Sequence, residues 1–115
     1  MKVLVTGGAG FIGANLVRQL TDEHPENEVV VLDDLSTGAR ENLSDTKVVL
    51  VEGSILDKEL LNDLVADVSA IVHLAGRGSV PRSVEHPLAA HEVNATGTVH
   101  VLEAARHHGA VHVIV

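Results

Sequence analysis

The stretch Thr6-Gly7-Gly8-Ala9-Gly10-Phe11-Ile12-Gly13 lies between an apolar run, Val3-Leu4-Val5, and a helix-like apolar pattern that begins at Ile12. Its glycines fit both G-x-G-x-x-G (Gly8, Gly10, Gly13) and G-x-x-G-x-x-G (Gly7, Gly10, Gly13). Glycine permits a sharp strand-to-helix turn, close approach of the backbone to a pyrophosphate, and tight helix packing. The helix start then offers unpaired N–H groups and a positive dipole end to phosphates. Alone, the pattern also fits a tight turn without a ligand.

A carboxylate at the end of the next apolar run strengthens the dinucleotide interpretation. Val29-Val30-Val31-Leu32 ends in Asp33, which lies 20 residues after Gly13. An acid at this spacing typically accepts hydrogen bonds from the hydroxyls of the adenosine ribose. Asp33 and its neighbour Asp34 favour NAD over NADP, because they would repel a 2′-phosphate. Arg40 is a counter-signal, since an arginine near this loop can receive that phosphate.

Length, charge and composition exclude several classes of protein. The 115 residues suffice for one small domain, and they carry 16 acidic against 8 basic side chains, a net charge of −8. With one Phe and no Trp or Tyr, we expect no nucleic-acid partner and no anionic membrane partner. The sequence has no cysteine, no apolar span of transmembrane length and no signal-peptide pattern, so a cytoplasmic location is expected.

Short apolar runs alternate with helix-like segments along the whole chain. We predict strands at 2–6, 28–32, 48–51, 70–75 and 111–115, helices at 11–23, after Asp57 and at 88–108, a short helical turn at 39–44, and a polar loop at 76–87. This alternation predicts an α/β fold, a Rossmann-type doubly wound parallel sheet of strand order 3-2-1-4-5 that is truncated after strand 5. The ligand crevice should lie at the carboxyl ends of the strands, between strands 1 and 4.

Two further segments are candidates for cofactor contacts. Leu74-Ala75-Gly76 follows the fourth strand and places small residues near the expected pyrophosphate and nicotinamide ribose. Asn94 is a poor residue for a helix interior, so it could fix neighbouring backbone, serve a cofactor, or simply face solvent. The eight His residues show no compact ligand spacing, and we expect no metal site. The sequence has neither a nucleophile elbow nor a P-loop.

Four motifs together resemble the extended short-chain dehydrogenase/reductases, and within them the NAD-dependent nucleotide-sugar epimerases and dehydratases. They are Thr6–Gly13, Asp33-Asp34-Leu35-Ser36-Thr37-Gly38, His73-Leu74-Ala75-Gly76 and Asn94-Ala95-Thr96-Gly97-Thr98. The segment Gly78-Ser79-Val80-Pro81-Arg82-Ser83 is similar to the loop of the UDP-hexose 4-epimerases, including those acting on N-acetylated sugars. The resemblance runs through the whole chain and matches only the N-terminal part of such enzymes.

The resemblance implies a site for tightly held NAD, which takes a hydride from C4 of the sugar and returns it to the other face. The cofactor residues it implies are Gly7, Gly10, Phe11, Ile12, Gly13, Asp33, Asp34, Ser36, Thr37, Gly38, Ser54, Ile55, Leu74, Ala75, Gly76 and Asn94. Ser79 and Arg82 would lie near the sugar or its diphosphate. Ser54 departs from the family, which often has Asp there to meet the adenine amine.

The catalytic motifs of the family have no counterpart in this sequence. The family's Ser/Thr follows the fifth strand and its Tyr-x-x-x-Lys comes later, whereas this chain has no tyrosine and has lysines only at 2, 47 and 58. We therefore predict one NAD-binding Rossmann domain over residues 1–115, the cofactor-binding portion of a UDP-sugar 4-epimerase, without catalytic residues or a substrate domain. The alternatives are a nucleotide-sugar dehydratase, decarboxylase or reductase, a non-catalytic NAD-binding module, and an interaction protein. The helix at 88–108 is also a candidate homodimer interface.

Overall fold

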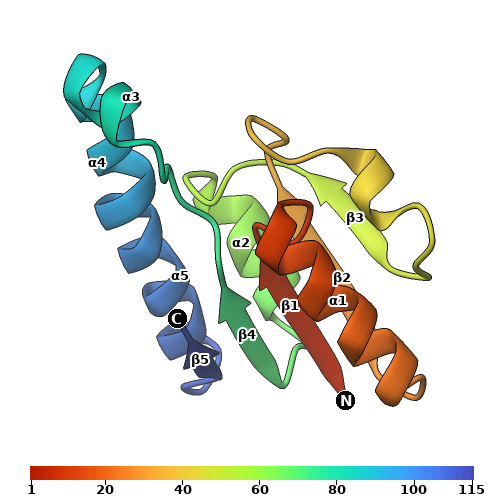
Figure 1. The fold of residues 1–115 in the computed structure, drawn as a ribbon. Helices are drawn as coiled ribbons and strands as arrows, with labels where there is room; N and C mark the ends of the chain where they lie inside the picture. Colours follow the sequence, from red (N-terminus) through yellow and green to blue (C-terminus); the bar gives the residue numbers. More distant parts are fainter.

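Five parallel strands form the centre of the molecule, and the computed structural model describes all residues from 1 to 115 (Figure 1). Their order is β3-β2-β1-β4-β5, which confirms the predicted topology. The strands are β1 (Lys2–Thr6), β2 (Glu28–Asp33), β3 (Val49–Glu52), β4 (Ala70–His73) and β5 (His112–Ile114). The helical segments are α1 (Phe11–Glu23), η1 (Arg40–Leu43), α2 (Lys58–Val65), α3 (Val80–Glu85), α4 (Pro87–His91), η2 (Glu92–Thr96) and α5 (Gly97–His107).

The register of the central strands explains why their apolar runs are continuous. Leu4 of β1 pairs with Val30 of β2 and Ile71 of β4, and all three side chains are buried. Its neighbour Val5 pairs with Val31 and is equally buried. Because successive side chains of a strand point to opposite faces, both faces of this sheet must be covered by helices.

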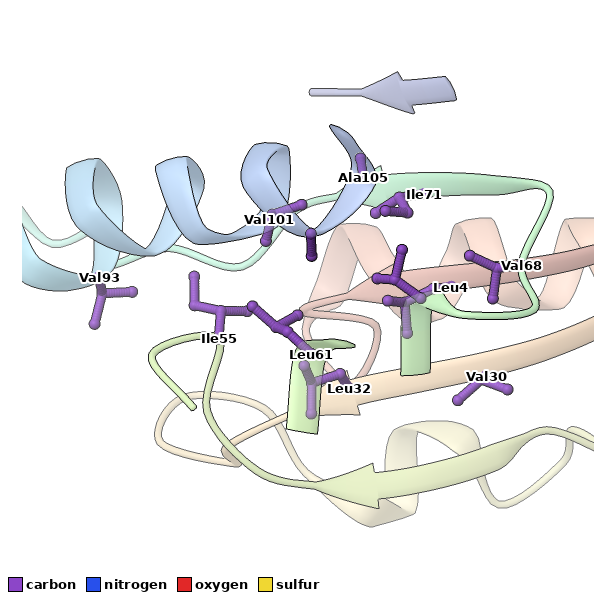
Figure 2. Close-up of a cluster of buried hydrophobic side chains, with 12 residues drawn as sticks. Leu4, Val30, Leu32, Ile55, Leu61, Val68, Ile71, Val93, Val101 and Ala105 are labelled. Atoms are coloured by element: carbon purple, nitrogen blue, oxygen red, sulfur yellow. The ribbon is translucent and has the colours of Figure 1, made fainter. Parts of the chain in front are cut away.

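One face of the sheet packs against α2 and the long helical run that ends in α5. Figure 2 shows the cluster of buried side chains that fills this interface, with Val93, Val101 and Ala105 projecting from the helical run toward the strands. Leu61 of α2 and Leu4 of β1 are fully buried within the same cluster. The helix α2 begins where predicted, because the Asp57 carboxylate accepts a hydrogen bond from the Leu60 N–H at 3.1 Å.

The opposite face packs against α1 and η1. A second buried cluster joins Val3, Val5 and Val31 of the strands to Val17 of α1 and Leu43 of η1. The bounds of α1 match the predicted helix at 11–23, and η1 lies within the predicted turn at 39–44. Helices on both faces confirm the doubly wound arrangement.

The prediction of a loop over residues 76–87 was wrong, because α3 forms at Val80–Glu85 inside it. The Ser79 side chain accepts a hydrogen bond from the Arg82 N–H at 3.3 Å, so it caps the start of this helix. Pro81 lies in the first turn, where its missing N–H costs no helical hydrogen bond. These two start signals are local in sequence and outweigh the polar composition.

The predicted helix at 88–108 is also different in detail. It starts one residue earlier, at Pro87, ends at His107, and changes to π-helical geometry over Glu92–Thr96 between α4 and α5. A π-helical segment hydrogen-bonds to the fifth residue along, so it shifts the face on which the following side chains lie. Gly109 follows the helical run at a φ of 89°, the left-handed conformation in which helices commonly end. No helix in the structure combines the length and apolar character that membrane crossing requires.

Candidate functional site

A cleft of about 360 Å³ opens at the carboxyl ends of the central strands. It is formed by the turn after β1, the loops after β2, β3 and β4, and Val93 of η2. Fourteen residues predicted to contact a cofactor line it: Gly7, Gly10, Phe11, Ile12, Gly13, Asp33, Asp34, Ser36, Thr37, Ser54, Ile55, Leu74, Ala75 and Gly76. Segments more than 60 residues apart in the sequence therefore meet at the predicted edge of the sheet.

Two glycines of the turn, Gly7 and Gly13, lie so close to other backbone atoms that they have no room for a side chain. Gly7 adopts a φ of 72°, and a Cβ there would lie 2.7 Å from the backbone nitrogen of Ala75. A Cβ on Gly13 would overlap the carbonyl oxygen of Gly7 and lie 2.6 Å from the Cα of Gly8. Gly10 differs, because the nearest protein atom to its Cβ would be the Gly7 oxygen at 3.5 Å. The space beside Gly10 is left open to the cleft.

The start of α1 presents backbone donors to that space. Gly10 precedes the helix and supplies no capping side chain, and the first helical hydrogen bond runs from the Ala14 N–H to the Gly10 carbonyl oxygen at 2.9 Å. The N–H groups of Phe11, Ile12 and Gly13 therefore have no acceptor within the helix. Such donors, at the positive end of the helix dipole, fit a phosphate group.

The Asp33 carboxylate is held rigidly at the end of β2. Only 9% of this residue is exposed, and its two oxygens accept hydrogen bonds from the Ala9 N–H (3.0 Å) and the Leu35 N–H (2.8 Å). Each carboxylate oxygen can accept more than one hydrogen bond, so acceptor capacity remains for hydroxyl groups in the cleft. Leu35, which donates one of these hydrogen bonds, has a φ of 61°, a left-handed conformation that residues other than glycine rarely adopt.

Asp34 is joined to Arg77 from the loop after β4, a contact that sequence reasoning missed. Arg77 Nη2 lies 3.5 Å from Asp34 Oδ2, and Arg77 Nη1 donates a hydrogen bond to the Ser36 hydroxyl. Partial burial acts to raise the pKa of Asp34, but hydrogen bonds from the Ser36 hydroxyl and N–H, together with the Arg77 charge, outweigh it and hold the pKa below its ordinary value. The loop after β2 therefore carries an ionised carboxylate paired with a cation.

Asn94 contacts the loop after β4 and does not line the cleft. Its side-chain oxygen accepts a hydrogen bond from the Arg77 N–H at 2.6 Å, and its side-chain nitrogen donates to the Arg77 carbonyl oxygen at 3.1 Å. Of the three roles considered for Asn94, the structure supports fixing a neighbouring backbone segment.

His73, near the carboxyl end of β4, is a second polar side chain whose contacts were not predicted from the sequence. The residue is 4% exposed, with ring nitrogen Nδ1 2.6 Å from the Thr6 hydroxyl and Nε2 2.9 Å from the Thr98 hydroxyl. Burial lowers the pKa of His73 below its ordinary value, so the neutral ring is favoured. The interruption of an apolar strand by a histidine was a signal that could have identified it.

The remaining candidates lie outside this cleft. Gly38 packs beneath the glycine turn, where a Cβ would come 2.7 Å from the Ala9 oxygen. Ser79 and Arg82 line a second cavity, of about 190 Å³, which shares Thr37 and Arg77 with the first. Arg40, the counter-signal for NADP, pairs with Glu52 at 3.4 Å and does not line the cleft. No group of three or more His, Cys, Asp or Glu side chains is arranged to hold a metal ion.

Comparison with known proteins gives a consistent result. Residues 3–115 match the NAD dependent epimerase/dehydratase family. The chain is 46% identical to the dTDP-glucose 4,6-dehydratase of Mycobacterium tuberculosis, covering 95% of this chain and 34% of the relative. It is 42% identical to the UDP-glucose 4-epimerase of Lactobacillus helveticus, covering 90% of this chain and 31% of the relative. The chain thus spans about a third of the length of the curated relatives it matches.

Two solved structures show the same architecture. The UDP-glucose 4-epimerase of Thermus thermophilus in complex with NAD is 41% identical and superposes with a TM-score of 0.86, over 96% of this chain and 35% of the other. The dTDP-glucose 4,6-dehydratase of Streptomyces venezuelae, also with NAD bound, is 41% identical with a TM-score of 0.89, over 98% of this chain and 38% of the other.

Proposed function

Because the chain belongs to the NAD dependent epimerase/dehydratase family, we propose that its cleft binds NAD and forms the cofactor-binding part of a UDP-sugar 4-epimerase. The observation that carries this proposal is the juxtaposition, within one cleft, of the open space beside Gly10 and the buried carboxylate of Asp33. These two features suit the two ends of the adenosine diphosphate half of a dinucleotide.

The pyrophosphate would lie against the start of α1. The N–H groups of Phe11, Ile12 and Gly13 supply hydrogen bonds there, and Gly10 leaves the room a phosphate needs. Any side chain introduced in place of Gly10 would occupy the space proposed for the phosphate.

The adenosine ribose would lie beside Asp33, and the adenine beside Ser54 and Ile55. Both oxygens of Asp33 are already oriented by backbone N–H groups, so the carboxylate would accept hydrogen bonds from the ribose hydroxyls without reorganisation. The same charge, next to ionised Asp34, would repel the 2′-phosphate of NADP. We therefore propose a preference for NAD.

The nicotinamide half would lie along Leu74, Ala75 and Gly76, at the end of β4. When bound, NAD supplies the acceptor that takes a hydride and returns it. This chain would bind the cofactor and orient it across the end of β1. The neighbouring cavity of about 190 Å³ would remain available for a substrate. Ser79 and Arg82 line that cavity, which supports a UDP-sugar beside the cofactor.

A nucleotide-sugar 4,6-dehydratase is the second candidate, supported by the 46% identity to a dTDP-glucose 4,6-dehydratase. Both reactions need the same cofactor cleft, so the cleft favours neither. We keep the epimerase as the main proposal because the loop around Ser79 and Arg82 resembles that of the 4-epimerases. A homodimer through residues 88–108, where Leu88, Val99 and Leu102 are exposed, also stays a proposal, as do the cytoplasmic location and the absence of nucleic-acid and membrane partners.

Calorimetric titration of the purified chain with NAD and NADP tests the cofactor proposal. We expect NAD to bind and NADP to bind much more weakly. Equal binding of the two cofactors, or no binding of NAD to a folded chain, would contradict it. Titration of the NAD-loaded protein with UDP-glucose and dTDP-glucose then compares the two reactions: tighter binding of UDP-glucose supports the epimerase, and tighter binding of dTDP-glucose supports the dehydratase.

A further inference from the structure

We propose that Arg77 is a clamp that crosses the cleft and slows the release of the bound dinucleotide. This inference rests on the proposed function, since it concerns how the same cleft retains NAD. One ion pair, Arg77–Asp34, joins the two loops on either side of the glycine turn. Arg77 belongs to the loop after β4, and its guanidinium pairs with Asp34 and Ser36 from the loop after β2.

The sheet order places this contact over the proposed pyrophosphate site. In the order β3-β2-β1-β4-β5, β1 lies between the two strands whose loops the arginine joins. Strands two positions apart are separated by about 10 Å, a span that an extended arginine side chain and a short loop can bridge. The side chain therefore passes across the carboxyl end of β1, where Gly7 starts the turn that leads to the N-terminus of α1. Gly7, Asp34 and Arg77 all line the same cleft.

The backbone of the clamp is anchored separately from its side chain. Asn94 of η2 hydrogen-bonds to both the N–H and the carbonyl oxygen of Arg77. Only the guanidinium end must therefore move to open the cleft, while the loop stays in place. The contacts at that end are partly exposed, with 32% of the Arg77 side chain and 36% of the Asp34 side chain accessible to solvent. Contacts of this strength break and re-form readily, as passage of a ligand requires.

Charge gives the clamp a second effect on an anionic ligand. Asp33 and Asp34 place two neighbouring carboxylates beside the proposed site of a diphosphate, and like charges repel. The Arg77 guanidinium pairs with Asp34 and so neutralises one of these two negative charges. It carries five N–H donors in a planar fork and uses two nitrogens on Asp34 and Ser36, so donors remain for a phosphate oxygen.

The dissociation rate of NAD tests this inference. We compare the wild-type chain, Arg77→Met, and Arg106→Met by stopped-flow displacement of bound NAD, with a thermal melt of each variant. Arg106 pairs with Glu103 on the surface of α5, so its substitution removes the same charge outside the cleft. We expect NAD to leave Arg77→Met about fivefold faster, the change that loss of a partly exposed ion pair produces, with an unchanged melting temperature. Arg106→Met should release NAD like the wild type.

A double-mutant cycle with Asp34→Asn distinguishes loss of the Arg77–Asp34 pair from a general loss of folding in Arg77→Met. If Arg77 acts by pairing with Asp34, the double variant should release NAD no faster than the faster single variant. Fully additive effects would overturn the clamp, as would an unchanged release rate in Arg77→Met. If the wild-type chain folds but binds no NAD, the proposed function itself fails, so that outcome is distinct from NAD binding without a clamp.

Discussion

The hydroxyl of Thr6 and ring nitrogen Nδ1 of His73 lie 2.6 Å apart, which joins β1 and β4 by a buried hydrogen bond at the point where the cleft begins. The direction of this bond follows from its neighbours. The Thr98 hydroxyl donates to the Asn94 carbonyl oxygen at 2.7 Å, so it accepts from the His73 Nε2–H. Nδ1 is then the unprotonated nitrogen, and the Thr6 hydroxyl donates to it.

The same hydroxyl shapes the loop after β4. Thr6 Oγ1 accepts hydrogen bonds from the Leu74 N–H at 3.1 Å and the Ala75 N–H at 3.2 Å. A protonated His73 would present N–H groups on both sides of the ring and lose its acceptor toward Thr6. The hydrogen bonds that join β1, β4 and the loop after β4 therefore require a neutral His73 ring.

Stability should fall at acid pH because of His73. Burial lowers its folded-state pKa below the ordinary value near 6.5. The unfolded chain then takes up the proton first, so the stabilising contribution is fully present above about pH 6.5 and is lost as pH falls through the folded-state pKa. Urea unfolding at pH 7.5 and 5.5 checks this. The wild type should lose more stability between the two pH values than His73→Gln, whereas the exposed-site control His91→Gln should keep the wild-type difference.

Two glycines of the turn should respond differently to the same substitution. Gly13→Ala forces a Cβ against the Gly7 carbonyl, so we expect a loss of about 1–3 kcal/mol in the free energy of unfolding, as in other overpacked sites. Gly10→Ala meets no protein atom closer than 3.5 Å and should cost about 1 kcal/mol or less, through poorer capping. It should nevertheless weaken NAD binding at least tenfold, since the methyl group occupies the proposed phosphate position. Calorimetry and urea unfolding of both variants measure this; NAD affinity preserved in Gly10→Ala would remove that position from the site.

Asp33→Ala should change both stability and cofactor choice. The substitution leaves the N–H groups of Ala9 and Leu35 without their acceptor, which costs about 1–3 kcal/mol. It also removes one charge that repels a 2′-phosphate, so the ratio of NAD to NADP affinity should fall toward one. This ratio does not depend on the fraction of folded protein, and parallel titrations give it directly. Asp63→Ala, on the surface of α2, should leave the ratio unchanged.

Asn94→Ala should loosen the loop after β4 without unfolding the sheet. Two hydrogen bonds to the Arg77 backbone are lost, each worth about 1 kcal/mol. We expect amide hydrogen exchange at Arg77 to be at least fivefold faster, while exchange within β1 and β4 is unaffected. Asn62→Ala on α2 is the matched control. Unchanged exchange at Arg77 would mean that the loop is held by other contacts.

The order of strands and the position of the cleft could be predicted because their signals are local. Continuous apolar runs such as Val3-Leu4-Val5 indicate strands buried on both faces, and the glycine turn with Asp33 after the next strand identifies which strand ends face a ligand. The start of a helix after Asp57 was also predicted, since capping depends on the residue itself and its immediate neighbours. Residues such as Ser54 and Ile55 reach the cleft simply because β3 ends there.

The two errors in the predicted elements have different causes, one local and one tertiary. The start signals Ser79 and Pro81 produced α3 inside a segment whose composition is typical of a loop. The change to π-helical geometry at Glu92–Thr96 has no marker in a helix-like apolar pattern, because it depends on how the helical run packs on the sheet.

The sequence by itself thus determined the order of the strands, the sheet topology and the edge at which a dinucleotide would bind, because strand and turn preferences act over a few residues. Only the tertiary structure decided which polar side chains meet there. Arg77 and Asp34 are 43 residues apart, and Thr6 and His73 are 67 residues apart. Neither pair carries a pattern, since each contact exists only because parallel strands bring their carboxyl ends to one edge of the sheet and packing sets the direction of each side chain.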